Sequence, residues 1–242
     1  MMSRLIPYIL FTILIVYLFI VLIFATKKLG EITCKGVRVA VDNQVSVAFV
    51  DEEEVLRMIK RGYGEVLENR ITGVDKDSLE KILVKNPMIK SAQVYYSLDG
   101  YFHINIEQRE PVLRVMAGEH YYVDTDGKVM PLSSKFTSRV IVATGHITKE
   151  FACKKLFPFV KMLKENVFWD AYFEQIVVRS NEDIVLIPKV GDFKIILGKV
   201  ENCEERMEKL LLFFKHGIAK RGWNRYKEVN LKFENQVVCL RK

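Results

Sequence analysis

The stretch His103–Met116, HINIEQREPVLRVM, decides how the chain divides into domains. Its first half alternates apolar and polar residues, as a β-strand with one exposed face does. An apolar run follows Pro111, and a proline cannot donate a hydrogen bond to a strand ladder, so pairing has to break there. Gln108, Arg109 and Glu110 are therefore predicted to form a short, polar connection between two domains. The alternative is a functional charge cluster, but linker composition explains these residues without a ligand.

The region before this junction predicts a small module with the order strand, helix, helix, strand, strand. Valines recur at every second position in much of Lys35–Val50, which is typical of a strand with one buried face. Asp51 is expected to cap the first helix, and Asp75 or Asp77 the second. Two strands joined by the hairpin signal Asp-Gly complete the module: Ile89–Leu98 and Tyr101–Gln108.

The region after the junction predicts a domain made mostly of strands. The clearest helix, Cys203–Lys220, carries one apolar stripe, and Lys154–Asn166 also shows helical spacing. The expected strands are Val112–Ala117, Glu119–Val123, Val129–Leu132, Arg139–Thr144, Phe173–Arg179, Asp183–Lys189, Phe193–Leu197, Lys227–Phe233 and Gln236–Arg241.

The N-terminal segment Leu5–Ala25 contains 21 residues and no charge. At ~1.5 Å per residue it is long enough for the ~30 Å hydrocarbon core of a bilayer. It ends in Ile-Phe-Ala-Thr-Lys-Lys and not in a small-residue cleavage site, so an uncleaved membrane anchor is predicted. The positive-inside rule alone favours a cytoplasmic location for the rest of the chain, although large domains translocate largely regardless of charge.

Composition and motifs argue against several function classes. Lys and Arg are interleaved with Asp and Glu, so the net charge of +7 describes a mixed surface without the basic stripe of a nucleic-acid-binding protein. The common nucleotide-binding, hydrolase and zinc motifs are absent, and the histidines are solitary. Asp124-Thr-Asp-Gly127 is interpreted as a turn and not as a carboxylate dyad or cation site. Neither an enzyme nor a cofactor or metal site is predicted.

The four cysteines, Cys34, Cys153, Cys203 and Cys239, are widely scattered and contain no CxxC pair. Because free cysteine is among the most buried residue types, and Cys239 lies in the apolar stretch Val-Val-Cys-Leu, buried thiols are expected. A disulfide remains open if this part of the chain lies outside the cytoplasm.

Four motifs in this order resemble the FtsQ/DivIB family of bacterial cell-division proteins: Asn86–Val94, Gln108–Val112, Tyr122–Gly127 and Val229–Phe233. The last departs from the family pattern, since Asn230 replaces an acid and Lys232 an arginine. The resemblance implies an α+β fold with a cytoplasmic segment (1–4), a single N-terminal transmembrane helix (5–26), a β-α-α-β-β POTRA-like domain (32–109) and a mostly β domain (110–242) with a C-terminal helix and terminal strands.

The resemblance also implies a function. It indicates a non-catalytic division scaffold in the cytoplasmic membrane at the septum, with the bulk of the chain outside the cytoplasm, contrary to the weak charge argument. Its implied partners are small bitopic FtsB-like and FtsL-like proteins, with other divisome members at the POTRA-like domain. The rival hypothesis is a POTRA-containing export factor or envelope enzyme, which requires a following β-barrel or a polar cleft with perturbed carboxylates.

The expected partner site is the free edge of the final strand, because an exposed edge is a template for a partner strand. The contact positions carried over from the family are Lys232, Phe233, Asn235, Val237, Val238, Cys239 and Leu240. The step Arg179-Ser180 matches a family arginine that meets a partner carboxylate. The alternatives are an ordinary terminal strand protected by Lys232 and Arg241, and a solvated edge charge at Arg179.

Overall fold

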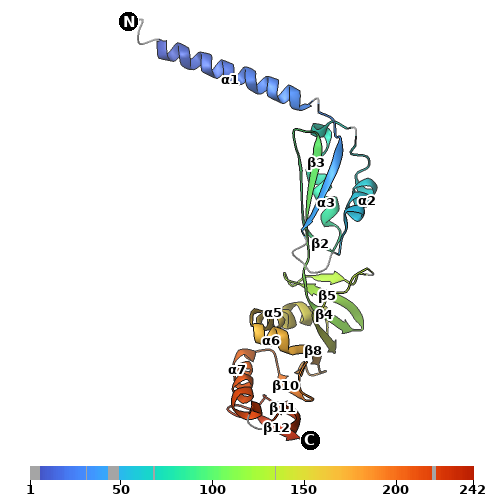
Figure 1. The fold of residues 1–242 in the computed structure, drawn as a ribbon, viewed down its shortest axis with the longest axis vertical. Coiled ribbons are helices and arrows are strands. Elements are labelled where there is room, and N and C mark those ends of the chain that lie inside the picture. Colours follow the sequence, from blue (N-terminus) through green and yellow to red (C-terminus); the bar gives the residue numbers. More distant parts are fainter. Residues whose placement is uncertain (1–5, 31, 43–48, 68, 134, 220–221) are drawn as a thin grey trace. The chain divides into compact units, whose positions relative to one another are not determined.

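The structure, a computed structural model, describes residues 6–30, 32–42, 49–67, 69–133, 135–219 and 222–242. The chain forms two compact units, Met1–Gln108 and Arg109–Lys242 (Figure 1). The first contains a POTRA-like arrangement and the second is rich in strands, so the α+β class is confirmed.

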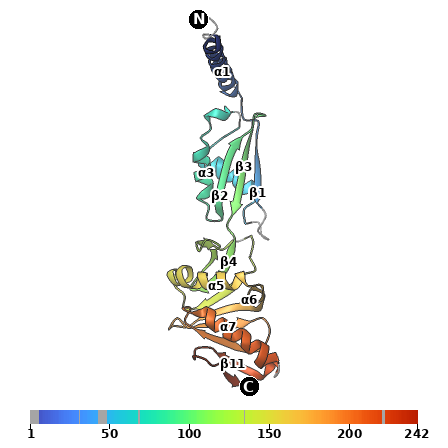
Figure 2. The same cartoon turned by 90° about the vertical axis from the view of Figure 1, so that its left-hand side faces the viewer.

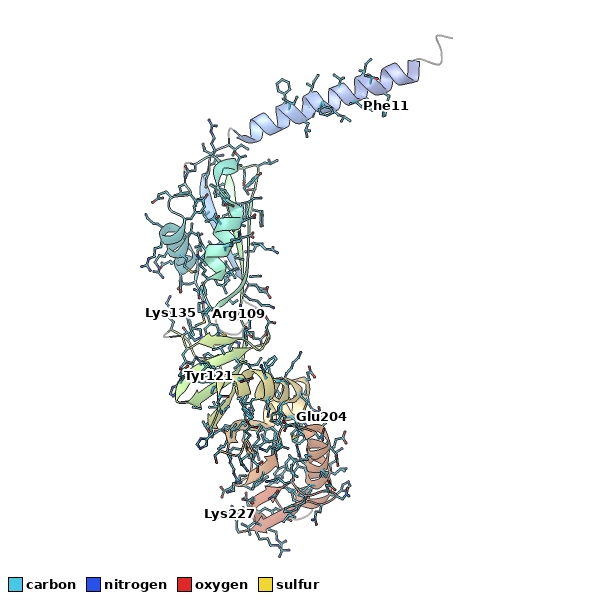
Figure 3. All side chains as sticks on the ribbon, turned by 180° about the vertical axis from the view of Figure 1, so that it is seen from behind. Phe11, Arg109, Tyr121, Lys135, Glu204 and Lys227 are labelled. Atoms are coloured by element: carbon cyan, nitrogen blue, oxygen red, sulfur yellow. The ribbon has the colours of Figure 1, made fainter. Side chains whose placement is uncertain are left out.

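Helix α1 covers Ile6–Gly30. Its described side chains, those of residues 10–24, are exposed, and Phe11 projects from the helix (Figure 3). In the part of the chain that the structure describes, no helix combines the length and apolar character needed to cross a membrane. The transmembrane anchor predicted over residues 5–26 is therefore not confirmed.

The first unit has the predicted order of elements. They are β1 (Gly36–Asp42), α2 (Glu52–Gly62), the 3₁₀ turn η2 (Ile71–Gly73), α3 (Lys76–Val84), β2 (Ile89–Tyr96) and β3 (Tyr101–Gln108). The sheet order is β1-β3-β2, with β1 parallel and β2 antiparallel to β3 (Figures 1 and 2). Part of the predicted strand Lys35–Val50, residues 43–48, lies outside the described residues.

The predicted caps and turn of this unit are confirmed. Asp51 Oδ1 accepts a hydrogen bond from Glu54 N at 2.8 Å, and Asp75 Oδ1 accepts one from Ser78 N at 3.2 Å. Gly100 has φ +92°, a conformation that glycine adopts without strain, and it closes the β2–β3 hairpin. Leu83 of α3 and Phe102 of β3 are fully buried, so the helices and the sheet share one core.

Two of the three polar residues of the junction, Gln108 and Arg109, are less exposed than a linker composition predicts, whereas Glu110 is exposed. The Gln108 side chain is buried, and its Oε1 accepts hydrogen bonds from Phe49 N at 2.7 Å and Val50 N at 2.9 Å. Arg109, labelled in Figure 3, pairs with the buried carboxylate of Asp124 at 2.7 Å. The ladder does break before Pro111, as predicted. However, the side chains of Gln108 and Arg109 do not form a solvated connection. Gln108 bonds to residues of the first unit, and Arg109 pairs with a residue of the second unit.

The second unit is a nine-stranded sheet with helices. Its elements are β4 (Pro111–Ala117), β5 (Glu119–Asp124), β6 (Val129–Pro131), β7 (Ile141–Gly145), α4 (Lys149–Phe151), the π-helix η3 (Ala152–Leu156), α5 (Phe157–Glu165), α6 (Val167–Tyr172), β8 (Phe173–Val178), β9 (Ile184–Pro188), β10 (Lys194–Gly198), α7 (Cys203–Phe213), the π-helix η4 (Phe214–Ile218), the 3₁₀ turn η5 (Trp223–Arg225), β11 (Tyr226–Asn230) and β12 (Val238–Arg241). The strand order is β12-β11-β10-β9-β8-β7-β4-β5-β6.

One face of this sheet packs against the helices α5, α6 and α7 (Figure 2). Paired strand residues on that face form a continuous buried row across the sheet. The row includes Ile176, Leu186, Ile195 and Val229. The core therefore extends along almost the whole sheet, which keeps the last strands attached to a stable layer.

Some boundaries differ from the sequence-based prediction. The first helical segment begins at Lys149, where Thr148 Oγ1 accepts a hydrogen bond from Phe151 N at 3.1 Å, and it continues through a π-helical turn that places Pro158 in the first turn of α5. A proline has no N–H to donate to the preceding helical turn, and the hydrogen-bond ladder is irregular directly before it, where Phe157 N donates to Ala152 O five residues back. The short helix α6 was not predicted, and Asn166 caps it through Phe168 N at 3.0 Å.

Candidate partner-binding edge

Strand β12 is the outermost strand of the large sheet. It pairs antiparallel with β11, with Val229 opposite Cys239 and Asn230 opposite Val238. Among the described residues, β12 ends the strand order on that side. The sequence-based prediction of a final strand at a sheet edge is therefore confirmed for Val238–Arg241.

The side chains of β12 alternate between two environments. Val237, just before the strand, and Cys239 pack against the helix-side core. Val238 and Leu240 point to the other face and are 42% and 56% exposed. Natural edge strands are usually protected by charge, proline or coverage. Two of the four side chains of β12 are exposed aliphatics, and Arg241 is the one charged residue of the strand.

A groove of about 530 Å³ lies between the α7 region and the loop that leads into β12. It is lined by Lys209, Leu212, Phe213, His216, Gly217, Asn235, Gln236 and Val237. Leu212 is 57% exposed although the neighbouring Leu210 is fully buried, so α7 turns an apolar side chain toward solvent beside the groove. The arrangement offers a strand edge and an adjoining apolar recess.

The loop before β12 shortens the predicted strand Lys227–Phe233. Strand β11 ends at Asn230, and Leu231 N continues the contact with β10 by donating to Ile196 O at 2.9 Å. Phe233 therefore lies in a turn and not in a strand, and its side chain is half-exposed. Asn235 has φ +55°, in the left-handed region that asparagine tolerates better than most residues.

Lys232 is committed to an internal ion pair. Its Nζ lies 2.7 Å from Oδ2 of Asp183, whose side chain is 4% exposed. The hydrogen bond from Lys232 lowers the pKa of Asp183 below its ordinary value. Lys232 thus satisfies a buried carboxylate and anchors the loop to the start of β9. This finding weakens the prediction that Lys232 contacts a partner or protects the edge.

Arg179 is not brought beside β12. It lies in the turn between β8 and β9, where its N donates to Asp183 O at 2.9 Å, and its side chain is exposed. In the strand order, β9 and β8 are three and four positions from β12. At about 4.8 Å per strand, the separation is about 14–19 Å. A partner that meets both places has to extend along the end of the sheet.

Sequence reasoning missed the α7 side of this site. Leu212 lies off the apolar stripe of its helix, which was identified from Met207, Leu210 and Ile218 among others. An apolar residue on the polar face of an amphipathic helix was the available signal. The lining residues Leu212, Phe213 and Gln236 were therefore absent from the prediction.

Other predicted features have structural explanations. Asp124 Oδ1 accepts hydrogen bonds from Asp126 N and Lys128 N at 2.9 and 2.7 Å, which confirms the turn Asp124–Gly127. All four cysteines are free thiols; two are buried and two half-buried. Burial raises the pKa of the Cys203 thiol. Within the described ranges no cluster of three or more histidine, cysteine or carboxylate side chains could hold a metal ion.

The fold and this edge define a class of protein: a POTRA-like domain followed by a β-rich domain whose last strand is open on one side. Comparison with family models agrees. A POTRA-like domain model matches residues 32–107, and a model described as FtsQ/DivIB, C-terminal related, matches residues 110–240. The chain therefore belongs to the FtsQ/DivIB family of cell-division proteins. No curated protein matches the chain.

Proposed function

We propose that this protein is a non-catalytic division scaffold that binds a small bitopic membrane partner, of the FtsB or FtsL kind, by adding the partner's strand to β12. The observation that carries the proposal is the apolar edge strand beside a groove. Main-chain hydrogen bonds in such an addition supply affinity, and alternate side chains supply specificity. A partner strand paired with β12 would direct every second side chain toward α7.

The predicted contact residues divide into three groups under this proposal. Val238 and Leu240 provide apolar contacts on the exposed face, and Val237 and Cys239 border the helix side. Phe233 and Asn235 shape the approach from the preceding turn. Lys232 and Arg179 are peripheral: Lys232 because it is paired internally, and Arg179 because it lies several strands away.

Membrane attachment and septal location form part of the same proposal. Their support is the uncharged sequence Leu5–Ala25, the helix Ile6–Gly30 and the family assignment. We propose that the bulk of the chain lies outside the cytoplasm and that the POTRA-like domain meets further division proteins. A fluorescent fusion of the full chain tests this location. A mid-cell band supports the proposal, whereas a uniform envelope signal supports an export or envelope-enzyme role.

The strand-addition site is tested by binding of a synthetic peptide from the extracytoplasmic part of an FtsB-like partner to the full chain in mild detergent. Leu240→Glu should weaken binding about tenfold or more, because burying a leucine is worth about 1.5–3 kcal/mol and 1.4 kcal/mol is a factor of ten. Val167→Glu is a matched control, since Val167 is also apolar and is 87% exposed on α6. Equal affinities of the two variants would reject the β12 site.

A further inference from the structure

The outer edge of β2 in the first unit is in contact with a carboxylate from its own domain. Glu80, on α3, accepts a hydrogen bond through Oε1 from Val94 N at 2.7 Å. Among the described residues, β2 is the last strand of its sheet on that side. The Val94 amide therefore points away from β3, and the alternation of an antiparallel ladder turns the Ala92 amide the same way.

Successive turns of helix α3 lie beside successive outward-facing residues of β2. Lys76 Nζ lies 5.1 Å from the centre of the Tyr96 ring, Glu80 reaches Val94, and Val84 and Ala92 line the same groove of about 330 Å³. Four helical residues rise about 6 Å and two strand residues about 6.7 Å, so the two series stay nearly in register. The helix thus holds the Glu80 carboxylate where a partner strand would place a carbonyl oxygen.

We propose that Glu80 guards the β2 edge and prevents it from pairing with the β2 edge of a second copy of this chain. The β2 strand of a second copy fits this edge. If two β2 strands pair antiparallel and are centred on Gln93, Ala92 of each copy lies opposite Val94 of the other. That pairing sets Ser91 opposite Tyr95 and Gln93 opposite Gln93, so it brings no like charges together. The acceptor that Glu80 supplies occupies the Val94 amide that this pairing needs.

The first test is amide hydrogen exchange at Val94 in the full chain. Glu80→Ala removes the acceptor, whereas Glu80→Gln keeps a side-chain oxygen that accepts a hydrogen bond. Exchange at Val94 should be at least tenfold faster in the alanine variant and within about threefold of wild type in the glutamine variant. Amides inside α3, such as that of Leu83, report global stability and should change less. Unchanged exchange at Val94 would reject the contact.

The second test measures edge pairing by position-specific cross-linking. Gln93 is exposed at the centre of the expected pairing, so Gln93→Cys should form a symmetric disulfide only if two β2 edges meet. The covalent dimer fraction should rise at least threefold in Q93C/E80A over Q93C/E80Q. Q93C/D77A, which removes another exposed carboxylate of α3, should behave like Q93C/E80Q. If Val94 exchange rises in E80A but cross-linking does not, the guarding role is rejected.

Discussion

Strands β2 and β12 have the same kind of position in their sheets, but the side chains beside their free edges differ in chemical character. Each is the outermost strand of its sheet and each pairs antiparallel with one neighbour. Helix α3 places Glu80 against Val94 at the β2 edge. At the β12 edge, the nearby helix α7 contributes Leu212 and Phe213 to a groove, and Val238 and Leu240 are exposed.

The difference shows that strand propensity does not decide whether an edge is open. Strand β2 is rich in β-branched and aromatic residues, whereas β12 has only Val238 of these types, yet both form the outermost strand of a sheet. The deciding factor is the side chain that a neighbouring helix brings to the edge. A carboxylate supplies the acceptor that a partner strand would offer, whereas an apolar groove offers a partner side chain a place to bind.

The largest effect is expected when the apolar character of β12 is removed at both exposed positions. The double variant Val238→Glu/Leu240→Glu should weaken binding of the partner peptide about a hundredfold, because each buried aliphatic side chain is worth more than ~1.4 kcal/mol. Isothermal titration against the full chain measures the effect. Thermal unfolding that matches wild type shows that the domain remains folded. Retained affinity would mean that β12 is an ordinary terminal strand.

The next effect concerns the ion pair that anchors the loop before β12. Lys232→Met should lower the free energy of unfolding by about 1–3 kcal/mol near neutral pH, because it leaves the buried Asp183 carboxylate unpaired. The lower part of this range is favoured since the Lys232 side chain is 44% exposed. Urea titration measures the change, with Lys227→Met as a control at an exposed lysine of β11.

This pair also predicts a pH dependence. The pKa of Asp183 is lowered in the folded state, so the wild-type pair contributes its stability above the ordinary aspartate pKa of about 3.9. That contribution is lost as the pH falls through the lower, folded-state pKa. The difference in stability between wild type and Lys232→Met should therefore shrink below about pH 4. A difference that stays constant from pH 7 to pH 3 would contradict the assigned cause.

A smaller effect is expected for stability when the β2 edge is opened. Glu80→Ala removes one hydrogen bond to a main-chain amide, which is worth about 0.5–1.5 kcal/mol. Chemical unfolding of the first unit measures it, and Glu80→Gln should recover most of the loss. Partner-peptide binding at β12 should be unchanged in both variants. A loss of partner-peptide binding in Glu80→Ala would show that the two edges are not functionally independent.

The smallest effect is expected at Arg179. Charge reversal by Arg179→Glu should weaken partner binding only about two- to fivefold, because exposed ion pairs contribute about 0.2–1 kcal/mol and this side chain lies several strands from β12. The effect should diminish at high salt, as surface electrostatics do. Binding measured at two ionic strengths distinguishes this outcome. A loss larger than that of Leu240→Glu would move the main contact to the β8–β9 turn.

Local signals in the sequence identified much of the fold correctly. The side chains of Asp51 and Asp75 cap helices as expected, and Asp99-Gly100 closes the β2–β3 hairpin. These features depend on residues a few positions apart, so a short window contains the whole cause. The aromatic helix α6 escaped prediction because its six residues carry no helical period, and its place depends on packing of Trp169 and Tyr172 into the core.

The sequence predicted the strand of the candidate site but not the distant residues of the chain that surround it. The sequence identified the last strand and its apolar residues Val238 and Leu240. It did not reveal that Lys232 pairs with Asp183, which lies 49 positions earlier in the chain. Nor did it reveal that Leu212 shares a groove with the loop that leads into β12. Contacts of this range arise from strand order, and strand order is not encoded in any short segment.

By itself the sequence determined the alternation of strands, the helix caps and the break before Pro111, because backbone chemistry and hydrophobic period act over a few residues. Tertiary structure alone decided which strand edges are open. Glu80 reaches Val94 only because α3 packs along β2, and the loop into β12 lines a groove only because α7 lies beside that loop. Whether a strand edge is open depends on which helix or loop lies beside it. That helix or loop comes from another part of the chain, so no short stretch of sequence determines the outcome.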